Sequence, residues 1–210
     1  SWTSLFFGFL AGLCLAFGHF GFGGLFALIG GLLDAVDGLV ARMTDTVSEA
    51  GAILDTTLDR YVEFFFIGGL VIHYRDLPIL QVLTLLALMG SFMVSYSSAK
   101  AAELRVDPPK GSMRRPERMF YLVLGAVLSP ITIAEYEYVR DYPIKLGIPM
   151  VIAISLIAVL ANASAAERMA AIAKATRIRD LAKRKAAAVP AQDDLGDSAG
   201  TPAQDPARTR

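Results

Sequence analysis

The stretch that decides the fold runs from Asp34 to Asp59 and reads DAVDGLVARMTDTVSEAGAILDTTLD. It is rich in acidic residues, yet it lies between segments apolar enough to be membrane helices. Ionisable residues inside membrane helices are costly and usually serve a function. The stretch therefore predicts a membrane-embedded fold built around a cluster of carboxylates.

The composition of the whole chain agrees with a membrane protein. Of its 210 residues, 54% are hydrophobic and 19% are charged, with a mean hydropathy of +0.49, whereas soluble domains are about 25% charged. The formal net charge is zero, so no basic field would attract nucleic acid. Cys14 is the only cysteine, which excludes an intrachain disulfide and a cysteine-rich metal site.

Six segments are candidates for membrane spans, because a spanning helix needs about 20 mostly apolar residues. They are residues 3–18, 22–42, 51–73, 78–99, 117–138 and 146–166. We expect an all-α, polytopic domain of six transmembrane helices over residues 1–166. The chain opens at Ser1 without a methionine and enters an apolar run almost at once, so we expect a truncated N-terminus.

The basic residues predict the orientation. Lys and Arg gather in the connections after the second and fourth spans and in the C-terminal region, while the other connections carry only Arg75, Arg140 and Lys145. Such a bias places both termini and the acidic stretch on the cytoplasmic side of the inner or plasma membrane. Residues 167–185 form a basic helical segment that lies on the anionic leaflet or is a solvated helix end, and residues 186–210 form a disordered tail.

The acidic stretch carries two pairs of carboxylates with helical spacing. Asp34 and Asp37 are three residues apart, and Asp55 and Asp59 are four apart on the next helix, so each pair shares one helix face. A short loop makes the two helices antiparallel, which brings both pairs to one depth. Oxygen ligands without His or Cys suit Mg²⁺ or Mn²⁺, with Ca²⁺ as a further option, and divalent ions would relieve the repulsion among the carboxylates.

Small residues beside these carboxylates leave room for a flat base or a diphosphate, although close helix packing explains small residues as well. Two metal ions that face phosphate oxygens are a common device in phosphoryl transfer. No Walker-type loop and no protein-kinase signature is present, which argues against ATP bound in those ways.

The complete pattern resembles the signature of the CDP-alcohol phosphotransferase family. It reads Asp34-x-x-Asp37-Gly38-x-x-Ala41-Arg42, then eight residues, then Gly51-x-x-x-Asp55-x-x-x-Asp59. The resemblance implies six transmembrane helices around a cytoplasm-facing polar cavity, and a homodimer. It also implies an enzyme that transfers a phosphatidyl group from a CDP-linked lipid such as CDP-diacylglycerol to a small polar alcohol, or a phosphoalcohol from a CDP-alcohol to a lipid, with release of CMP.

The resemblance also implies a role for each motif position. Two divalent ions, Mg²⁺ or Mn²⁺, would be held by Asp34, Asp37, Asp55 and Asp59, and Asp59 would also be the catalytic base. The CDP group would be bound by Asp34, Gly38, Ala41, Arg42, Gly51 and Asp55.

A second informative stretch, SYSSAKAAELRVDPPKGSMRRPERMFY, begins at Ser95. It is similar to the corresponding region of bacterial phosphatidylinositol-phosphate synthases, and Arg binds phosphate through two parallel hydrogen bonds. We therefore expect an acceptor phosphate to be bound by Lys100, Arg105, Arg114, Arg115 and Arg118, although the cytoplasmic bias of basic residues explains them equally well. The acceptor is expected to be a phosphorylated polyol, inositol phosphate first and glycerol 3-phosphate second, while serine and free inositol remain open.

A cation-coupled membrane transporter is the alternative from a different class, because transporters also use carboxylates within the membrane. In a transporter, however, the acidic residues are more often scattered over several helices than gathered at one end of two neighbours.

Overall fold

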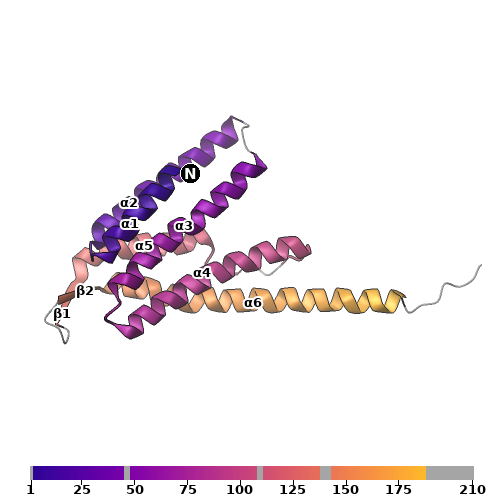
Figure 1. Ribbon diagram of the computed structural model, residues 1–210. Coiled ribbons are helices and arrows are strands. Elements are labelled where there is room, and N and C mark those ends of the chain that lie inside the picture. The colour runs from indigo at the N-terminus through magenta and orange to yellow at the C-terminus, as the bar shows by residue number, and fades with distance from the viewer. Residues whose placement is uncertain (1, 45–47, 108–110, 138–142, 188–210) are drawn as a thin grey trace, which may run out of the picture.

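The computed structural model describes residues 2–44, 48–107, 111–137 and 143–187. Its elements are α1 (Trp2–Ala16), α2 (Phe20–Met43), α3 (Glu49–His73), α4 (Pro78–Leu104), α5 (Arg115–Leu128), the short 3-10 helix η1 (Ser129–Thr132), β1 (Ile133–Glu137), β2 (Pro143–Gly147) and α6 (Ile148–Ala187). Figure 1 shows a bundle of these helices with one small hairpin at its edge. The helical architecture predicted from the sequence is confirmed.

Three of the described helices, α2, α4 and α6, are long and apolar enough to cross a membrane, and α1 is a shorter apolar helix. The other two differ for separate reasons: α5 has only 14 residues, and α3 carries Asp55, Asp59, Arg60 and Glu63 in its middle. Six transmembrane spans therefore stay a prediction, because length and composition identify three in the described part of the chain.

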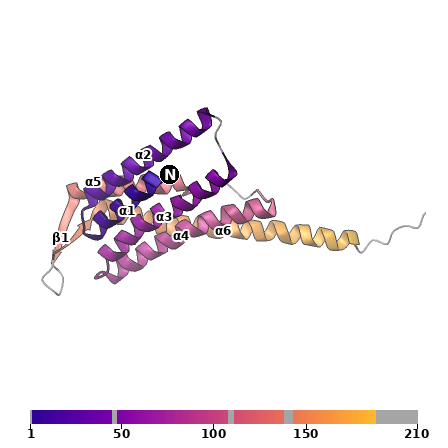
Figure 2. The same ribbon diagram turned by 45° about the horizontal axis from the view of Figure 1, so that its top comes forward.

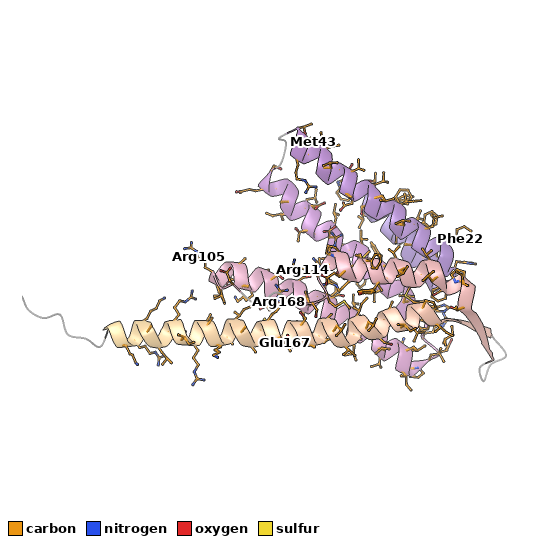
Figure 3. The ribbon with its side chains drawn as sticks, turned by 180° about the vertical axis from the view of Figure 1, so that it is seen from behind. Phe22, Met43, Arg105, Arg114, Glu167 and Arg168 are labelled. Carbon is orange, nitrogen blue, oxygen red and sulfur yellow. The ribbon has the colours of Figure 1, made fainter. Side chains whose placement is uncertain are left out.

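The helices pack in two groups, which are joined by α5 and by a direct contact of α3 with α4. Helix α1 packs against α2 and α3, α4 packs along α6, and α5 contacts both α2 and α6. Both ribbon views show α2 and α3 diverging from the α4–α6 pair toward one end of the bundle (Figures 1 and 2). At that diverging end lie Met43 at the end of α2 and Arg105 after α4, as Figure 3 shows.

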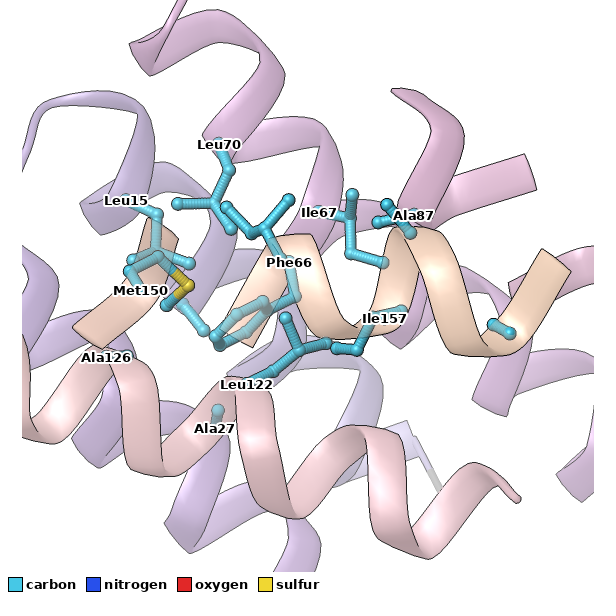
Figure 4. Close-up of a cluster of buried hydrophobic side chains, with 14 of the residues drawn as sticks. Leu15, Ala27, Phe66, Ile67, Leu70, Ala87, Leu122, Ala126, Met150 and Ile157 are labelled. Atoms are coloured by element: carbon cyan, nitrogen blue, oxygen red, sulfur yellow. The ribbon is translucent and has the colours of Figure 1, made fainter. Parts of the chain in front are cut away.

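The core lies where the two groups meet. Phe66, Ile67 and Leu70 of α3 are fully buried, and so are Leu122 of α5 and Ile157 of α6. Figure 4 shows that these side chains come from helices far apart in the sequence. Burying a large apolar side chain stabilises a fold by roughly 1.5–3 kcal/mol in water, and dense packing supplies the same cohesion among helices in lipid.

The predicted fifth span, residues 117–138, is wrong in its second half. Helix α5 ends at Leu128, and η1 and an antiparallel hairpin of β1 and β2 follow, with Ile133 opposite Gly147. Pro130 lacks a backbone N–H and stops the helix. The residues after it, ITIAE, begin with three β-branched residues in a row, and β-branched residues favour strands.

The end of α5 is tied to the start of α6 by Ser129. Its Oγ donates to the carbonyl oxygen of Gly125 at 2.6 Å and accepts from the backbone N–H of Met150 at 3.3 Å. The hairpin is thus a short connection between two helices that pack on each other.

Helix α6 continues from Ile148 to Ala187 without a break at residue 166. The predicted helical segment 167–185 is helical and extends the span instead of starting a separate helix. Arg179 Nη1 donates to the carbonyl oxygen of Leu104 at 2.9 Å, which holds the extension beside the end of α4. Most of the predicted tail, residues 188–210, lies outside the described residues.

Helices α1 and α3 approach each other through two glycines. A Cβ added at Gly12 would strike the carbonyl oxygen of Phe65, and one added at Gly69 would strike the carbonyl oxygen of Gly12. Small residues at such crossings let helix backbones come close in a membrane. This approach fixes α3 against α1 and so sets the position of the carboxylates of α3.

We therefore expect Gly69→Ala to lower the thermal unfolding temperature in detergent, because the new methyl group must push two backbones apart. Overpacking of this kind costs about 1–3 kcal/mol. Gly68→Ala is the matched control, since a Cβ at Gly68 meets nothing within 4 Å. Equal stability of the two variants, measured by circular dichroism, would contradict this packing.

Candidate active site

Two helices bring three of the predicted carboxylates to one place. Asp34 of α2 and Asp55 and Asp59 of α3 each offer an oxygen, and these oxygens all lie within 4.8 Å of one another. Asp59 is only 8% exposed, and Asp34 is half-buried. Because no His or Cys takes part in this cluster, it matches the oxygen ligands that Mg²⁺ and Mn²⁺ prefer.

The two clustered carboxylates of α3 lie in its first half. Ser48 caps the helix, and its Oγ accepts a hydrogen bond from the backbone N–H of Gly51 at 3.0 Å, which satisfies one of the free donors of the first turn. Asp55 and Asp59 follow Gly51 by one and two turns, so they share one face of the helix. The cap thus stabilises the end of α3 that carries both carboxylates.

Asp37 was predicted as a fourth metal ligand, and it does not belong to the three-residue cluster. It is exposed on α2, about one turn beyond Asp34. Its role as a ligand stays a prediction.

The residues predicted for CDP lie along the open ends of α2 and α3. Gly38 and Ala41 are half-buried, and Arg42 and Gly51 are exposed. Among the described residues, a Cβ added at Gly38 would meet only Nη2 of Arg42, at 3.9 Å. The described part of the chain therefore leaves space beside the carboxylates on the side where the nucleotide was expected.

The first turn of α5 places two arginines against α3. Arg115 forms an ion pair with Asp59. Arg118 donates from Nε and Nη2 to the two carboxylate oxygens of Glu63, at 2.8 and 3.2 Å, and Glu63 also pairs with Arg60 at 3.0 Å. Both Arg118 and Glu63 are fully buried.

The predicted acceptor role of Arg118 conflicts with this geometry. Besides its two bonds to Glu63, its Nη1 donates to the carbonyl oxygen of Met113 at 2.7 Å, so an acceptor phosphate would have to break a buried ion pair to reach it. Sequence reasoning missed Glu63. The signal was present, because Glu63 follows Asp59 by four residues and Arg118 follows Arg115 by three, which is one turn on each helix.

The other predicted acceptor residues lie at the edges of the same end. Lys100 pairs with Glu103 at 2.9 Å, Arg105 is the left-handed C-terminal cap of α4 with φ 52°, and Arg114 is the exposed N-terminal cap of α5. The backbone N–H of Arg114 donates to Glu117 at 2.9 Å. These bonds hold the end of α4 and the start of α5 in place.

Arg168 of α6 was not predicted, and the structure adds it to this region. A Cβ at Gly111, in the connection before α5, would lie 3.0 Å from Cδ of Arg168, so this connection packs on α6. The Nε of Arg168 is buried without a partner among the described residues. Figure 3 shows Arg114 and Arg168 on the neighbouring elements α5 and α6.

A groove of about 410 Å³ opens beside Asp34 and Arg115. Apart from these two charged residues it is lined mostly by small and apolar side chains of α1, α2 and α5, among them Gly8, Ala27, Leu28, Met119, Phe120 and Val123. The groove is thus charged at the end beside Asp34 and Arg115 and apolar along the rest of its length.

Known proteins match this chain in sequence and in structure. The profile of the family described as CDP-alcohol phosphatidyltransferase matches residues 2–176. A bifunctional IPC transferase and DIPP synthase of Aquifex aeolicus is 38% identical over 114 residues, 50% of this chain and 27% of that protein. An archaetidylinositol phosphate synthase of Pyrococcus horikoshii is 33% identical over 115 residues, 54% of this chain and 59% of that protein. The chain thus spans less than two thirds of the length of each of these two relatives.

The solved structures include phosphatidylinositol phosphate synthase of Mycobacterium tuberculosis. Its crystal structure with CDP-DAG bound gives a TM-score of 0.67 at 25% identity, covering 80% of this chain and 82% of that chain. Its complex with manganese and citrate gives a TM-score of 0.68 at 22% identity, covering 80% of this chain and 78% of that chain. These likenesses establish a common fold.

The carboxylate cluster predicts a metal affinity that depends on its members. Asp55→Asn removes one ligand oxygen charge, and we expect Mn²⁺ to bind at least about tenfold more weakly, by analogy with the loss of metal-site groups. Glu49→Gln, an exposed change at the start of the same helix, is the control. Electron paramagnetic resonance of free Mn²⁺ gives both affinities, and an unchanged value for Asp55→Asn would contradict the site.

The buried ion pair predicts a large loss of stability when it is broken. Glu63→Gln leaves the guanidinium of Arg118 buried without its counter-charge, which costs about 3–5 kcal/mol. Arg75→Gln breaks the exposed pair with Asp76 at 3.4 Å and should cost no more than about 1 kcal/mol. Denaturant unfolding in detergent distinguishes the two, and similar losses would argue against a buried pair.

Proposed function

We propose that this chain, which belongs to the CDP-alcohol phosphatidyltransferase family, transfers a phosphatidyl group from a CDP-linked lipid to a small polar alcohol and releases CMP. The observation that carries the proposal is the meeting of Asp34, Asp55 and Asp59 from two helices, with an arginine of a third helix beside them. All the clustered protein ligands are carboxylate oxygens, and oxygen ligands are the ones that Mg²⁺ and Mn²⁺ take when they also bind phosphate.

In this proposal Asp34, Asp55 and Asp59, with Asp37, would hold two divalent ions. Such ions would supply positive charge to the oxygens of a pyrophosphate, which would make CMP a good leaving group. The relative from Mycobacterium tuberculosis has been crystallised with manganese, which supports the choice of metal.

The acceptor hydroxyl attacks the phosphorus that carries the lipid, a new P–O bond forms, and the P–O bond to CMP breaks. Asp59 receives the proton that the hydroxyl loses, because it lies deepest in the cluster and is its most buried member. A carboxylate beside metal ions is a weak base, so positioning and charge neutralisation supply most of the acceleration.

The nucleotide and the lipid have separate places around this centre. The CDP group lies along Gly38, Ala41, Arg42 and Gly51, where the ends of α2 and α3 leave space. An acyl chain lies in the apolar groove that begins at Asp34. The relative crystallised with CDP-DAG supports a CDP-linked lipid as the donor.

The acceptor is a phosphorylated polyol, with inositol phosphate as the first candidate. Two relatives are named as synthases of inositol phosphate lipids, and the basic residues of this end suit an anion. Arg115 and Arg168 each have a buried Nε without a partner among the described residues, so they are the best placed of these to receive a phosphate. Glycerol 3-phosphate, serine and free inositol are the alternatives that acceptor profiling would distinguish.

Orientation and assembly complete the proposal. The family consists of integral membrane proteins, and three described helices are fit to cross a membrane. The gathering of Lys and Arg in the connection after α4 and on α6 supports a site and termini that face the cytoplasm. A homodimer is the expected assembly.

We expect Asp59→Asn to reduce turnover at least about a thousandfold, because it removes both a ligand charge and the proton acceptor, while the CDP-linked lipid still binds. The measurement is release of CMP from CDP-diacylglycerol with inositol phosphate and Mg²⁺ or Mn²⁺, in the full chain in detergent. Arg177→Gln, a change at an exposed position of α6, should keep normal turnover. Normal turnover of Asp59→Asn, or CMP release without a divalent ion, would refute the mechanism.

A further inference from the structure

Two ion pairs join α3 to α5, and they differ in how the arginine is used. Asp59 pairs with Arg115 at the carboxylate cluster, and Glu63 pairs with Arg118 one turn behind it. The two arginine side chains are chemically identical and lie three residues apart on one helix. Any difference between them therefore reflects their surroundings.

Each of the three nitrogens of the Arg118 guanidinium has a hydrogen-bond partner. The edge formed by Nε and Nη2 binds both oxygens of Glu63, and Nη1 binds the carbonyl oxygen of Met113. The side chain is completely buried. Breaking this pair would leave two buried charges, so the contact is a permanent one.

The guanidinium of Arg115 is only partly used. Its Nη2 pairs with Oδ1 of Asp59, while its Nε is buried without a partner among the described residues. A side-chain exposure of 29% leaves it open to the site. The edge of Nε and Nη2 fits two oxygens of a phosphate at once, and an unpaired buried donor is costly. Arg115 would therefore gain a hydrogen bond by exchanging Asp59 for a tetrahedral anion.

Asp59 is also shared between two uses. Its carboxylate pairs with Arg115, and it is a member of the cluster with Asp34 and Asp55. A divalent ion bound in this cluster attracts Asp59 and repels the guanidinium. Metal and Arg115 thus compete for one carboxylate.

We propose, building on the function proposed above, that Arg115 is an exchange residue. It neutralises Asp59 while the carboxylate cluster is free of metal, and it turns to the phosphate of the acceptor when divalent ions take Asp59. Arg118 and Glu63 remain paired and hold α5 against α3 during the exchange, so Arg115 changes partner without the helix moving away. No bond of the reaction is made or broken in this step.

The exchange couples metal binding to acceptor binding. Divalent ions release the residue that binds the anion, and by linkage the anion must strengthen metal binding by the same factor. The acceptor site is then completed only after the metal site is filled. Acceptor without metal would meet an arginine already engaged.

Sulfate is a suitable probe, because it is a tetrahedral dianion that is not consumed. Isothermal titration of the full chain in detergent gives its affinity with and without Mn²⁺. We expect sulfate to bind the wild type roughly tenfold more tightly when Mn²⁺ is present, within the usual range of coupling between sites. Arg115→Gln should show weak sulfate binding under both conditions, whereas Arg177→Gln should keep the wild-type difference.

Direct attraction between Mn²⁺ and sulfate is separated from the exchange by two metal-free variants. Asp59→Asn releases Arg115 without any metal, so it should bind sulfate about as tightly as the Mn²⁺-loaded wild type. Asp34→Asn removes the same charge from the same cluster but leaves the pair of Asp59 and Arg115 in place, so it should gain little. If the two variants gain equally, or if Asp59→Asn binds sulfate no better than the wild type, the exchange is refuted.

The outcome does not depend on turnover. A wild type that releases no CMP but shows the expected sulfate pattern would refute the proposed function and leave the exchange standing. A wild type that releases CMP but lacks the sulfate pattern would refute the exchange alone. Size-exclusion profiles show whether each variant is folded. Should Asp59→Asn be misfolded, the Arg115→Gln comparison decides, because a gain from Mn²⁺ as large in that variant as in the wild type contradicts the proposal.

Discussion

Charged groups among apolar helices must be compensated, and this constraint organises the structure. Removing an ion from water costs several kcal/mol even after relaxation, so acidic residues within a bundle need arginines or metal ions nearby. Here most of the compensation lies within and between α3 and α5, the two helices that differ from ordinary membrane spans, and α2 adds one carboxylate. The groups involved are Asp34, Asp55, Asp59 and Glu63 on the acidic side, and Arg60, Arg115 and Arg118 on the basic side.

The same charges explain how a structural contact and a reactive site share one helix pair. Glu63 and Arg118 form a closed pair that holds the start of α5 in place. One turn away, Asp59 and Arg115 meet at the edge of the carboxylate cluster, where metal ions and substrates would enter. When divalent ions neutralise the carboxylates, the arginines leave the region positive, which favours the pyrophosphate of the donor and a phosphate on the acceptor.

The sequence predicted the centre of the site better than its surroundings. Spacing indicated that Asp34, Asp37, Asp55 and Asp59 would converge, because helix periodicity and a short loop determine which faces meet, and three of the four form one cluster while Asp37 lies outside it. Spacing did not separate Arg115 from Arg118, since their difference depends on the depth at which α5 packs on α3. That depth is set by contacts distant in the sequence, such as the packing of α5 on α2 and α6. The end of α5 was missed because an apolar run reads alike as a helix or as a strand unless Pro130 is given enough weight.

The central claim is that carboxylates of α2 and α3 together hold divalent ions against the pyrophosphate of a CDP group. Electron–nuclear double resonance of Mn²⁺ bound to the full chain, with CDP added, tests it most directly, because it detects phosphorus nuclei close to the metal. The account predicts a phosphorus-31 coupling that appears with CDP and is lost in Asp34→Asn. Bound Mn²⁺ and CDP without such a coupling would show that they occupy separate places, and would contradict the account.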